Sequence, residues 1–214
     1  MVDRHSRIME STLPDVHALL AARLHRLRTE QGLTLDALAQ RAGVSRSMIS
    51  LIERGESSPT AAVLDRLAAG LGVTIAALFA EEARPDASPL ARRVDQVTWR
   101  DPESGYLRRN LSPPGFSSPI ELVEIVLPAG ARVAYDTTVR AVGISQQVWV
   151  LNGEVEVTIG DVTHRLGKGD CLAMRVDRPT TFHNPTDHPA RYVVALTADP
   201  LPGGPGANHR ASAA

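Results

Sequence analysis

Hydrophobic positions recur at helical spacing from residue 16 to residue 79. In the first segment, "VHALLAARLHRLRTEQG", apolar side chains fall three or four residues apart, and Gly32 closes the segment. This spacing is typical of an amphipathic helix that ends at a glycine. The apolar positions are Val16, Leu19, Leu20, Leu24 and Leu27.

Shorter helical segments follow, and hydroxyl side chains open them. "TLDALAQRAG" begins with Thr34 as N-cap and stops at Gly43, and "SRSMISLIERG" repeats this plan with Ser45 and Gly55. A fourth helix is predicted in "SPTAAVLDRLAAGLG", capped near Thr60. The segment "TIAALF" predicts a short fifth helix.

The pattern changes at "EEARPDASPLARR", a charged and proline-rich stretch that is typical of a linker. Beyond it the hydrophobic period is two. In "EVEVTI" the three apolar side chains share one face of a strand, while Glu154, Glu156 and Thr158 share the other. Short segments of this kind, separated by Pro, Gly and Asn-Gly, indicate an antiparallel barrel or jelly roll.

The length and composition of the chain allow this division. A chain of 214 residues has room for two small domains, and an apolar fraction of 43% excludes a wholly disordered chain. The predicted order is a flexible N-terminus at 1–12, a helical domain at 13–80, a linker at 81–96, a β domain at 97–200 and a disordered tail at 201–214.

Charge and targeting signals limit how the chain could bind nucleic acid and where it is expected to be located. The net charge is −1, and residues 13–80 carry seven arginines against six acidic residues. Any affinity for nucleic acid must therefore come from where the arginines point. The chain has no run of about 18 apolar residues and no apolar signal core at its N-terminus. Its single cysteine, Cys171, cannot form an internal disulfide, so we expect a cytoplasmic protein with no membrane partner.

The stretch "AGVSRSMISLIERGESSP" at 42–59 combines a polar and an apolar helix face. Successive helical residues turn by about 100°, which separates the two sets of side chains and leaves Leu51 at the edge. Arg46, Ser47, Ser50 and Arg54 form the polar face. Met48, Ile49 and Ile52 form the apolar face, which we expect to be buried.

This polar face has the chemistry of a DNA reader. Arginine can form a bidentate pair with guanine, and serine can bond a base edge or a phosphate. With the preceding short helix and the tight "AGV" turn, the segment predicts a helix-turn-helix unit whose second helix enters the major groove. The structural alternatives are an exposed face that binds nothing, or one that contacts another protein. Glu53 is predicted to be structural, with a local ion pair.

The segment "LRTEQGLTLDALAQRAGVSRSMISLIERGESSPTAAVLDRLAAGLGV" resembles the Xre/Cro/C1-type helix-turn-helix domain of phage and bacterial repressors. The resemblance implies a five-helix, lambda-repressor-like domain that binds double-stranded DNA. It puts Arg46, Ser47 and Leu51 at base-reading positions with Ser50 beside them. Thr34 and Arg54 would contact phosphate. Leu35 departs from several relatives, which carry a phosphate-contacting Gln there.

Residues 97–198 resemble the barrel of the cupin superfamily, and a helix-turn-helix followed by a cupin is a familiar regulator layout. Metal-dependent cupins carry histidines and a glutamate at fixed spacings. Here the Glu position falls on Gln146, a His position falls on Thr180, and the His-x-His window near 139–142 has no histidine. We therefore expect no metal, no cofactor and no catalytic residue. His183 and Thr180 should point to opposite faces. Cys171 is predicted to be a small buried residue.

A cupin without metal still has an interior that can take a small ligand. By analogy, Gln146 and Thr180 would point into it. Further candidate wall residues are Tyr135, Arg140, Trp149 and Met174. Trp149 could instead fill the core and Arg140 could be a solvated loop residue. An arginine in the mouth would suit an anionic metabolite.

The sequence thus favours a DNA-binding transcriptional regulator whose cupin senses a small molecule, dimerises, or does both. A symmetric dimer would require a palindromic operator. Two alternatives remain. One is a metal-dependent cupin enzyme with an appended helix-turn-helix, since some proteins of this layout are iron-dependent epoxidases. The other is an adaptor that uses its helical domain for protein contacts.

Overall fold

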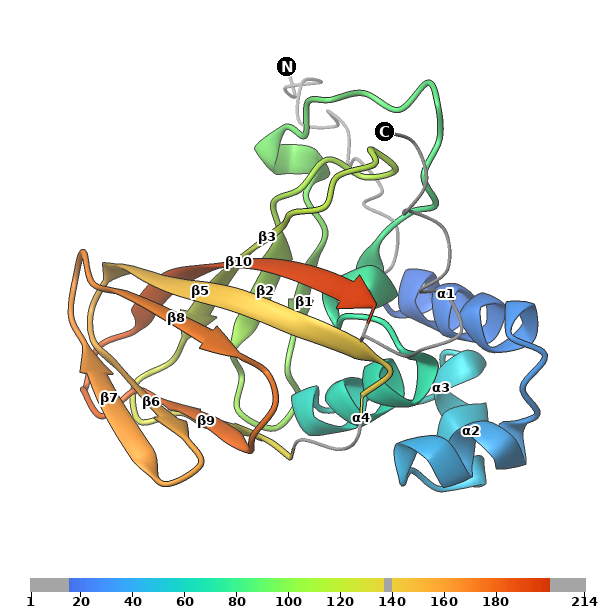
Figure 1. Ribbon diagram of the computed structural model, residues 1–214, viewed down its shortest axis with the longest axis horizontal. Helices are drawn as coiled ribbons and strands as arrows, with labels where there is room; N and C mark the ends of the chain where they lie inside the picture. Colours follow the sequence, from blue (N-terminus) through green and yellow to red (C-terminus); the bar gives the residue numbers. More distant parts are fainter. Residues whose placement is uncertain (1–15, 137–139, 201–214) are drawn as a thin grey trace, which may run out of the picture.

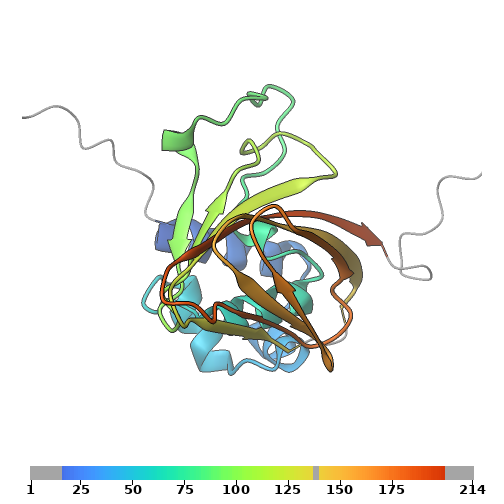
Figure 2. The same cartoon turned by 90° about the vertical axis from the view of Figure 1, so that its left-hand side faces the viewer.

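The computed structural model describes residues 16–136 and 140–200 (Figure 1). The expectations of a flexible 1–12 and a disordered 201–214 lie outside these residues. Within the described chain, helices occupy the N-terminal part and strands the C-terminal part. Seen from the β side, the helices lie behind the sheets (Figure 2).

Four α-helices form the described helical region, in place of the five predicted. They are α1 (Val16–Glu30), α2 (Leu35–Ala42), α3 (Arg46–Glu53) and α4 (Ala61–Leu71). The expected fifth helix is the 3₁₀ turn η1 (Ala76–Phe79), whose bonds run from Leu78 to Ile75 and from Ala80 to Ala77. In a segment of four residues, the few α-helical hydrogen bonds do not offset the conformational entropy lost on ordering the backbone. The burial of its apolar side chains therefore determines its geometry.

The helix ends follow the local sequence. Thr34, Ser45 and Thr60 each accept a bond at the side-chain oxygen from the backbone N–H three residues on, at 3.1, 3.2 and 3.4 Å. Gly43 follows α2 with φ at 63°, and Gly72 follows α4 with φ at 67°, both in the left-handed region that glycine adopts readily. The predicted caps are confirmed.

The strands form two sheets. A six-stranded sheet has the order β1-β2-β3-β10-β5-β8, and a four-stranded sheet has the order β4-β9-β6-β7, with antiparallel pairing throughout. Between helices and strands lies a second 3₁₀ turn, η2 (Arg93–Asp95). The strands are β1 (Thr98–Arg100), β2 (Leu107–Asn110), β3 (Glu121–Leu127), β4 (Arg132–Tyr135), β5 (Val142–Asn152), β6 (Val155–Ile159), β7 (Val162–Leu166), β8 (Cys171–Arg175), β9 (Thr180–His183) and β10 (Ala190–Pro200).

The two sheets do not close into the predicted barrel. The chain changes sheet six times: after β3, β4, β5, β7, β8 and β9. All of these connections except the one after β4 contain Pro or Gly, such as the turn at 167–170 where the Asp170 N–H bonds the Gly167 carbonyl. These turns interrupt the backbone hydrogen bonding, so β1, β8, β4 and β7 remain edge strands of the described sheets.

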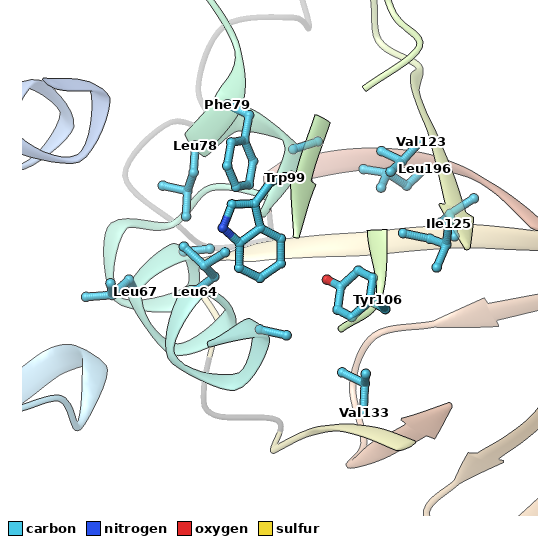
Figure 3. Close-up of a cluster of buried hydrophobic side chains, with 14 of the residues drawn as sticks. Leu64, Leu67, Leu78, Phe79, Trp99, Tyr106, Val123, Ile125, Val133 and Leu196 are labelled. Atoms are coloured by element: carbon cyan, nitrogen blue, oxygen red, sulfur yellow. The ribbon is translucent and has the colours of Figure 1, made fainter. Parts of the chain in front are cut away.

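A single hydrophobic core runs across the predicted boundary between the helical and β parts. Trp99 of β1 packs against Phe79 of η1 with ring centroids 5.9 Å apart and against Tyr106 at 5.7 Å. Leu64 and Leu67 of α4 lie on the helical side of this cluster (Figure 3). The helical part is therefore packed firmly onto one end of the β part.

The segment predicted as a linker also makes specific contacts with the rest of the molecule. The Arg84 N–H bonds the Gly115 carbonyl at 2.9 Å, and Glu82 pairs with Arg23 and Arg26 of α1 at 3.9 and 2.5 Å. These contacts bind the segment to both parts of the molecule. No helix in the described chain is both long and apolar enough to span a bilayer.

Candidate nucleic-acid interface and cavity

Helix α3 has the two faces that its sequence indicated. Ile49 and Ile52 are fully buried, whereas Arg46, Ser47 and Arg54 are exposed. Ser50 and Leu51 are partly exposed. The helix is thus held by two apolar side chains and presents the polar set outward.

The prediction that Met48 is buried is wrong, because its side chain is 36% exposed. The direction midway between Ile49 and Ile52 points into the core, and Met48 lies roughly 70° away from it around the helix. Its sulfur instead accepts a bond from Ser57 Oγ at 3.8 Å, in the loop after α3. Met48 therefore belongs to the rim of the exposed face.

Exposed acidic side chains accompany both arginines of the polar face. Arg46 Nε lies 3.4 Å from Asp36 Oδ1 of α2. Arg54 forms two bonds with Glu56 at 2.8 Å and a further one with Ser50 Oγ. Because these pairs are solvent-exposed, each stabilises the fold only weakly, and the arginines can exchange them for other anions.

The other predicted phosphate contact, Thr34, lies beside this face at the start of α2. It is exposed, and its hydroxyl oxygen already accepts the Ala37 N–H. Its hydroxyl proton remains available for donation to an anion. The structure therefore brings together the start of α2 and the polar face of α3 on one exposed surface.

Glu53 anchors α3 from the opposite side. Its carboxylate accepts from Arg28 Nε at 2.6 Å and approaches His25 Nδ1 at 2.9 Å, both on α1. Burial by itself would raise the pKa of Glu53, but the bonds from Arg28 and His25 outweigh it and hold the pKa below its ordinary value. Glu53 is structural as predicted, but its partners are 25 and 28 residues away in sequence. The expected local pair is wrong.

Polar bonds join the helical and β parts around α4. Arg140, just before β5, donates to Asp65 of α4 at 2.5 Å. The Ala61 N–H at the start of α4 donates to Asp101 Oδ1 at 2.9 Å, and Thr74 Oγ1 donates to Glu121 at 2.7 Å. Helix α4 thus fastens to the β part, while α2 and α3 lie farther from the sheets (Figure 1).

A cavity of about 80 Å³ lies where α4 meets the two sheets. Four predicted ligand residues line it: Tyr135, Arg140, Gln146 and Thr180. Arg140 is buried, so the alternative of a solvated loop residue is wrong. The remaining lining comes from both parts of the molecule: Asp65, Thr74, Ile75, Tyr106, Arg108, Ile125, Val133, Ile144, Val176, Phe182, Tyr192, Val194 and Leu196.

Two predicted wall residues do not line the cavity. Trp149 is 52% exposed because β5 turns its odd-numbered side chains to the outer face of the six-stranded sheet. It is neither a wall residue nor part of the core. Met174 is buried opposite Gln146 in the strand register but lies outside the lining. Cys171, paired with Trp149 in register, is exposed, so its predicted burial is also wrong.

Sequence reasoning missed Arg108 and Asp65. Arg108 lies on β2, two residues after Tyr106, and both residues line the cavity. The alternation of the strand places Arg108 on the inward side, and an arginine at an inward position could have been recognised from the sequence. Asp65 lies on the apolar face of α4 between Leu64 and Leu67. A charged residue among buried leucines indicates a partner from elsewhere in the fold.

Gln146 and Thr180, which the sequence comparison with metal-dependent cupins put at ligand positions, both line the cavity. His183 points away from Thr180 and pairs with Glu156 of β6 at 3.0 Å, as the odd step along β9 predicted. Throughout residues 16–136 and 140–200, no three His, Cys, Asp or Glu side chains gather in a metal-binding geometry.

Comparisons with known proteins agree with this architecture. A family described as "Helix-turn-helix" matches residues 24–78, and one described as "Cupin domain" matches residues 143–196. The HTH-type transcriptional regulator SutR of Escherichia coli (strain K12) is 26% identical over 170 residues, which cover 77% of this chain and 86% of SutR. The uncharacterized HTH-type transcriptional regulator y4dJ of Sinorhizobium fredii (strain NBRC 101917 / NGR234) is 40% identical over 60 residues, which cover 28% of this chain and 78% of y4dJ.

A solved structure extends the similarity to both parts of the molecule. The HTH_3 family transcriptional regulator from Vibrio cholerae superposes with a TM-score of 0.67 at 27% identity, covering 85% of this chain and 96% of that one. The chain belongs to the Xre-type helix-turn-helix transcriptional regulators and is a DNA-binding regulator with a C-terminal cupin domain.

Proposed function

We propose that α3 enters the major groove of an operator and reads its bases with Arg46, Ser47, Ser50 and Leu51. One observation carries this proposal: Ile49 and Ile52 hold α3 in the core while Arg46, Ser47 and Arg54 are exposed to solvent. The small serines permit close approach of the helix to the duplex, and Arg46 can pair with guanine.

Thr34 and Arg54 fix the domain on the sugar-phosphate backbone in this proposal. Both side chains are exposed at the ends of the reading surface. Phosphate would replace Glu56 as the partner of Arg54, in the same way that a base edge would replace Asp36 as the partner of Arg46. Phosphate contacts set the register without reading sequence.

The operator is palindromic in this proposal because the regulator is a homodimer. Support comes from the outer face of the six-stranded sheet, where Trp149 and Leu122 are 52% and 38% exposed. An exposed apolar face beside the edge strand β8 is typical of a surface that pairs with a second copy. Sedimentation of the wild type and of Trp149→Ser tests this, with a shift toward monomer expected for the variant.

The cupin part senses a small effector in the cavity beneath α4 and performs no catalysis. Its polar lining consists of arginine, tyrosine, threonine, glutamine and one aspartate. This set is suited to orienting a ligand, and it lacks the imidazole pair that iron-dependent cupins use. A regulator that acts on chromosomal operators would work in the cytoplasm.

Selection of bound fragments from the source genome, followed by gel retardation, tests the proposed function. We expect the wild type to retard a palindromic fragment and Arg46→Ala to lose preference at one base pair. Arg132→Ala, an exposed change on β4, is the matched control. If no fragment is enriched over random DNA, the operator proposal fails and the adaptor alternative gains.

A further inference from the structure

We infer that the cavity beneath α4 binds a small carboxylate between Arg108 and Arg140, and that this anion competes with Asp65 for Arg140. The inference rests on the proposed function, in which the cavity holds the effector. It adds the chemical class of that effector and the contact through which the effector would reach the helical part.

The charges lining the cavity do not balance. Arg108 and Arg140 are each 7% exposed, and the only acidic lining residue among the described positions is Asp65, 4% exposed. Asp65 pairs with Arg140. Arg108 makes no ion pair with any carboxylate in the part of the chain that the structure describes. A buried guanidinium without a counter-ion is costly, and an anion in the cavity would remove that cost.

Glu121 does not form an ion pair with Arg108. It lies outside the lining, and its carboxylate accepts from Thr74 Oγ1 at 2.7 Å. Burial raises the pKa of Glu121, while the Thr74 bond and the charge of Arg108 act in the opposite direction. Among the described residues, Arg108 therefore has no carboxylate within ion-pair distance.

Unpartnered polar atoms surround the same space. Arg108 Nε, Arg140 Nε and Asp65 Oδ2 are buried and have no hydrogen-bond partner. Buried polar groups are nearly always satisfied, so the two unpartnered guanidinium donors at one cavity indicate a ligand that accepts hydrogen bonds. Asp65 Oδ2 is itself an acceptor and would gain no partner from an anion. A carboxylate can accept two parallel N–H bonds from one guanidinium, which gives both arginines a partner of matching geometry.

The rest of the lining sets the size and polarity of the ligand. Tyr106 and Tyr135 hydroxyls lie 3.2 Å apart, and burial raises the pKa of both, so both remain protonated donors. Apolar side chains such as Ile125 and Ile144 complete the walls. A cavity of roughly 150 Å³ holds benzene. At about 80 Å³, roughly half of that, this one suits a carboxylate of about acetate size.

The competing residues belong to different parts of the molecule. Asp65 lies on α4 and Arg140 precedes β5, so their bond is one of the contacts that hold the helical part on the β part. A carboxylate on Arg140 leaves Asp65 without its partner and weakens that hold. Two recognition helices then lose their fixed spacing, and the anion lowers operator affinity. By linkage, operator DNA lowers the affinity for the anion by the same factor.

Isothermal titration of the full-length chain with sodium acetate tests the binding step, with acetamide and ethylamine as uncharged and cationic analogues. We expect heat of binding for acetate alone. Arg108→Met should weaken it by at least about tenfold, because a charge-assisted bond is lost. Arg132→Met, an exposed arginine on β4, should leave it unchanged.

Asp65→Asn gives a second readout that does not depend on removing an arginine. Its amide oxygen can still accept from Arg140, but the competing charge is gone, so acetate should bind more tightly. Thermal unfolding of each variant verifies folding. Equal binding of acetamide, or unchanged affinity in both Arg108→Met and Asp65→Asn, overturns the assignment of the anion site.

Gel retardation with and without acetate separates this inference from the proposed function. Reduced retardation of the wild type, absent in Arg108→Met, supports the coupling. Acetate binding without any change in retardation overturns the coupling while the DNA-binding proposal stands. Absence of retardation under all conditions counts against the DNA-binding proposal, and the titration still decides the anion site.

Discussion

The Arg140 guanidinium donates to the Asp65 carboxylate at 2.5 Å across the boundary between the helical and β parts, and both side chains are only 5% exposed. Burial raises the pKa of Asp65, against the opposing effect of Arg140. The pair is therefore costly to form from water, and it joins the two parts only while both partners are present.

Removing one partner of this pair should be strongly destabilising. Arg140→Met leaves Asp65 buried without a counter-ion, and we expect a loss of about 3–5 kcal/mol in the free energy of unfolding. The double variant Asp65→Leu with Arg140→Met should recover most of this loss, since no buried charge then remains. Urea denaturation of the two variants and the wild type measures the difference.

The exposed pair of Arg66 and Asp136 is the matched control, with an N–O distance of 3.3 Å. Arg66 follows Asp65 on α4, but Asp136 is 72% exposed. Arg66→Met should cost less than about 1 kcal/mol. If Arg66→Met costs as much as Arg140→Met, then removing an exposed charge destabilises the protein as much as removing a buried one. The role assigned to burial would then be wrong.

Glu53 should make stability depend on acid pH. Its pKa lies below the ordinary 4.5 in the folded chain, so the unfolded chain binds more protons between the two values. The stabilisation is complete above about pH 4.5 and is lost as pH falls through the folded pKa. Glu53→Gln should cost about 1–3 kcal/mol at pH 7, and that difference from wild type should shrink in acid. Chemical denaturation from pH 3 to pH 7 measures it, and a constant difference would contradict the assignment.

Arg46→Ala should weaken operator binding by about 1–3 kcal/mol and relax base preference at one position. The reason is that a bidentate contact from α3 to a base edge is lost. Competition binding with operators changed one base pair at a time measures both effects. Equal loss on every operator would mean that Arg46 contacts phosphate and not a base.

Arg54→Ala should behave differently, because it is assigned to phosphate. We expect weaker binding on operator and random DNA alike, with the salt dependence of affinity reduced by about one ion. Titrations at several salt concentrations give this slope. A changed base preference would contradict the assignment, and Arg132→Ala should alter neither quantity.

Local hydrogen bonds and side-chain periodicity determined what the sequence alone could predict. Thr34, Ser45 and Thr60 cap their helices through bonds that span three residues, so their roles are readable in a short window. The faces of α3 follow from the 3.6-residue turn, with Ile49 inside and Arg46 outside. From these features the sequence predicted the exposed polar face of α3 and the class of the fold.

The sequence around an apolar side chain near the end of a helix or the edge of a sheet did not determine whether that side chain is exposed. Met48, Trp149 and Cys171 are apolar residues that the sequence suggested would be inside, and all three are exposed. Whether such a side chain is covered depends on which other segment packs over it. In the described structure, no segment covers the outer face of β5 and β8 at Trp149 and Cys171.

Only the tertiary structure decided how the two parts meet. Asp65 and Arg140 are 75 residues apart, and Ala61 and Asp101 are 40 residues apart, so no periodic pattern links the partners. The cavity has the same origin, because α4 closes a space whose other walls come from two sheets. Each helix or strand is specified by neighbours in sequence, whereas a buried charge finds its partner only when distant segments have packed together.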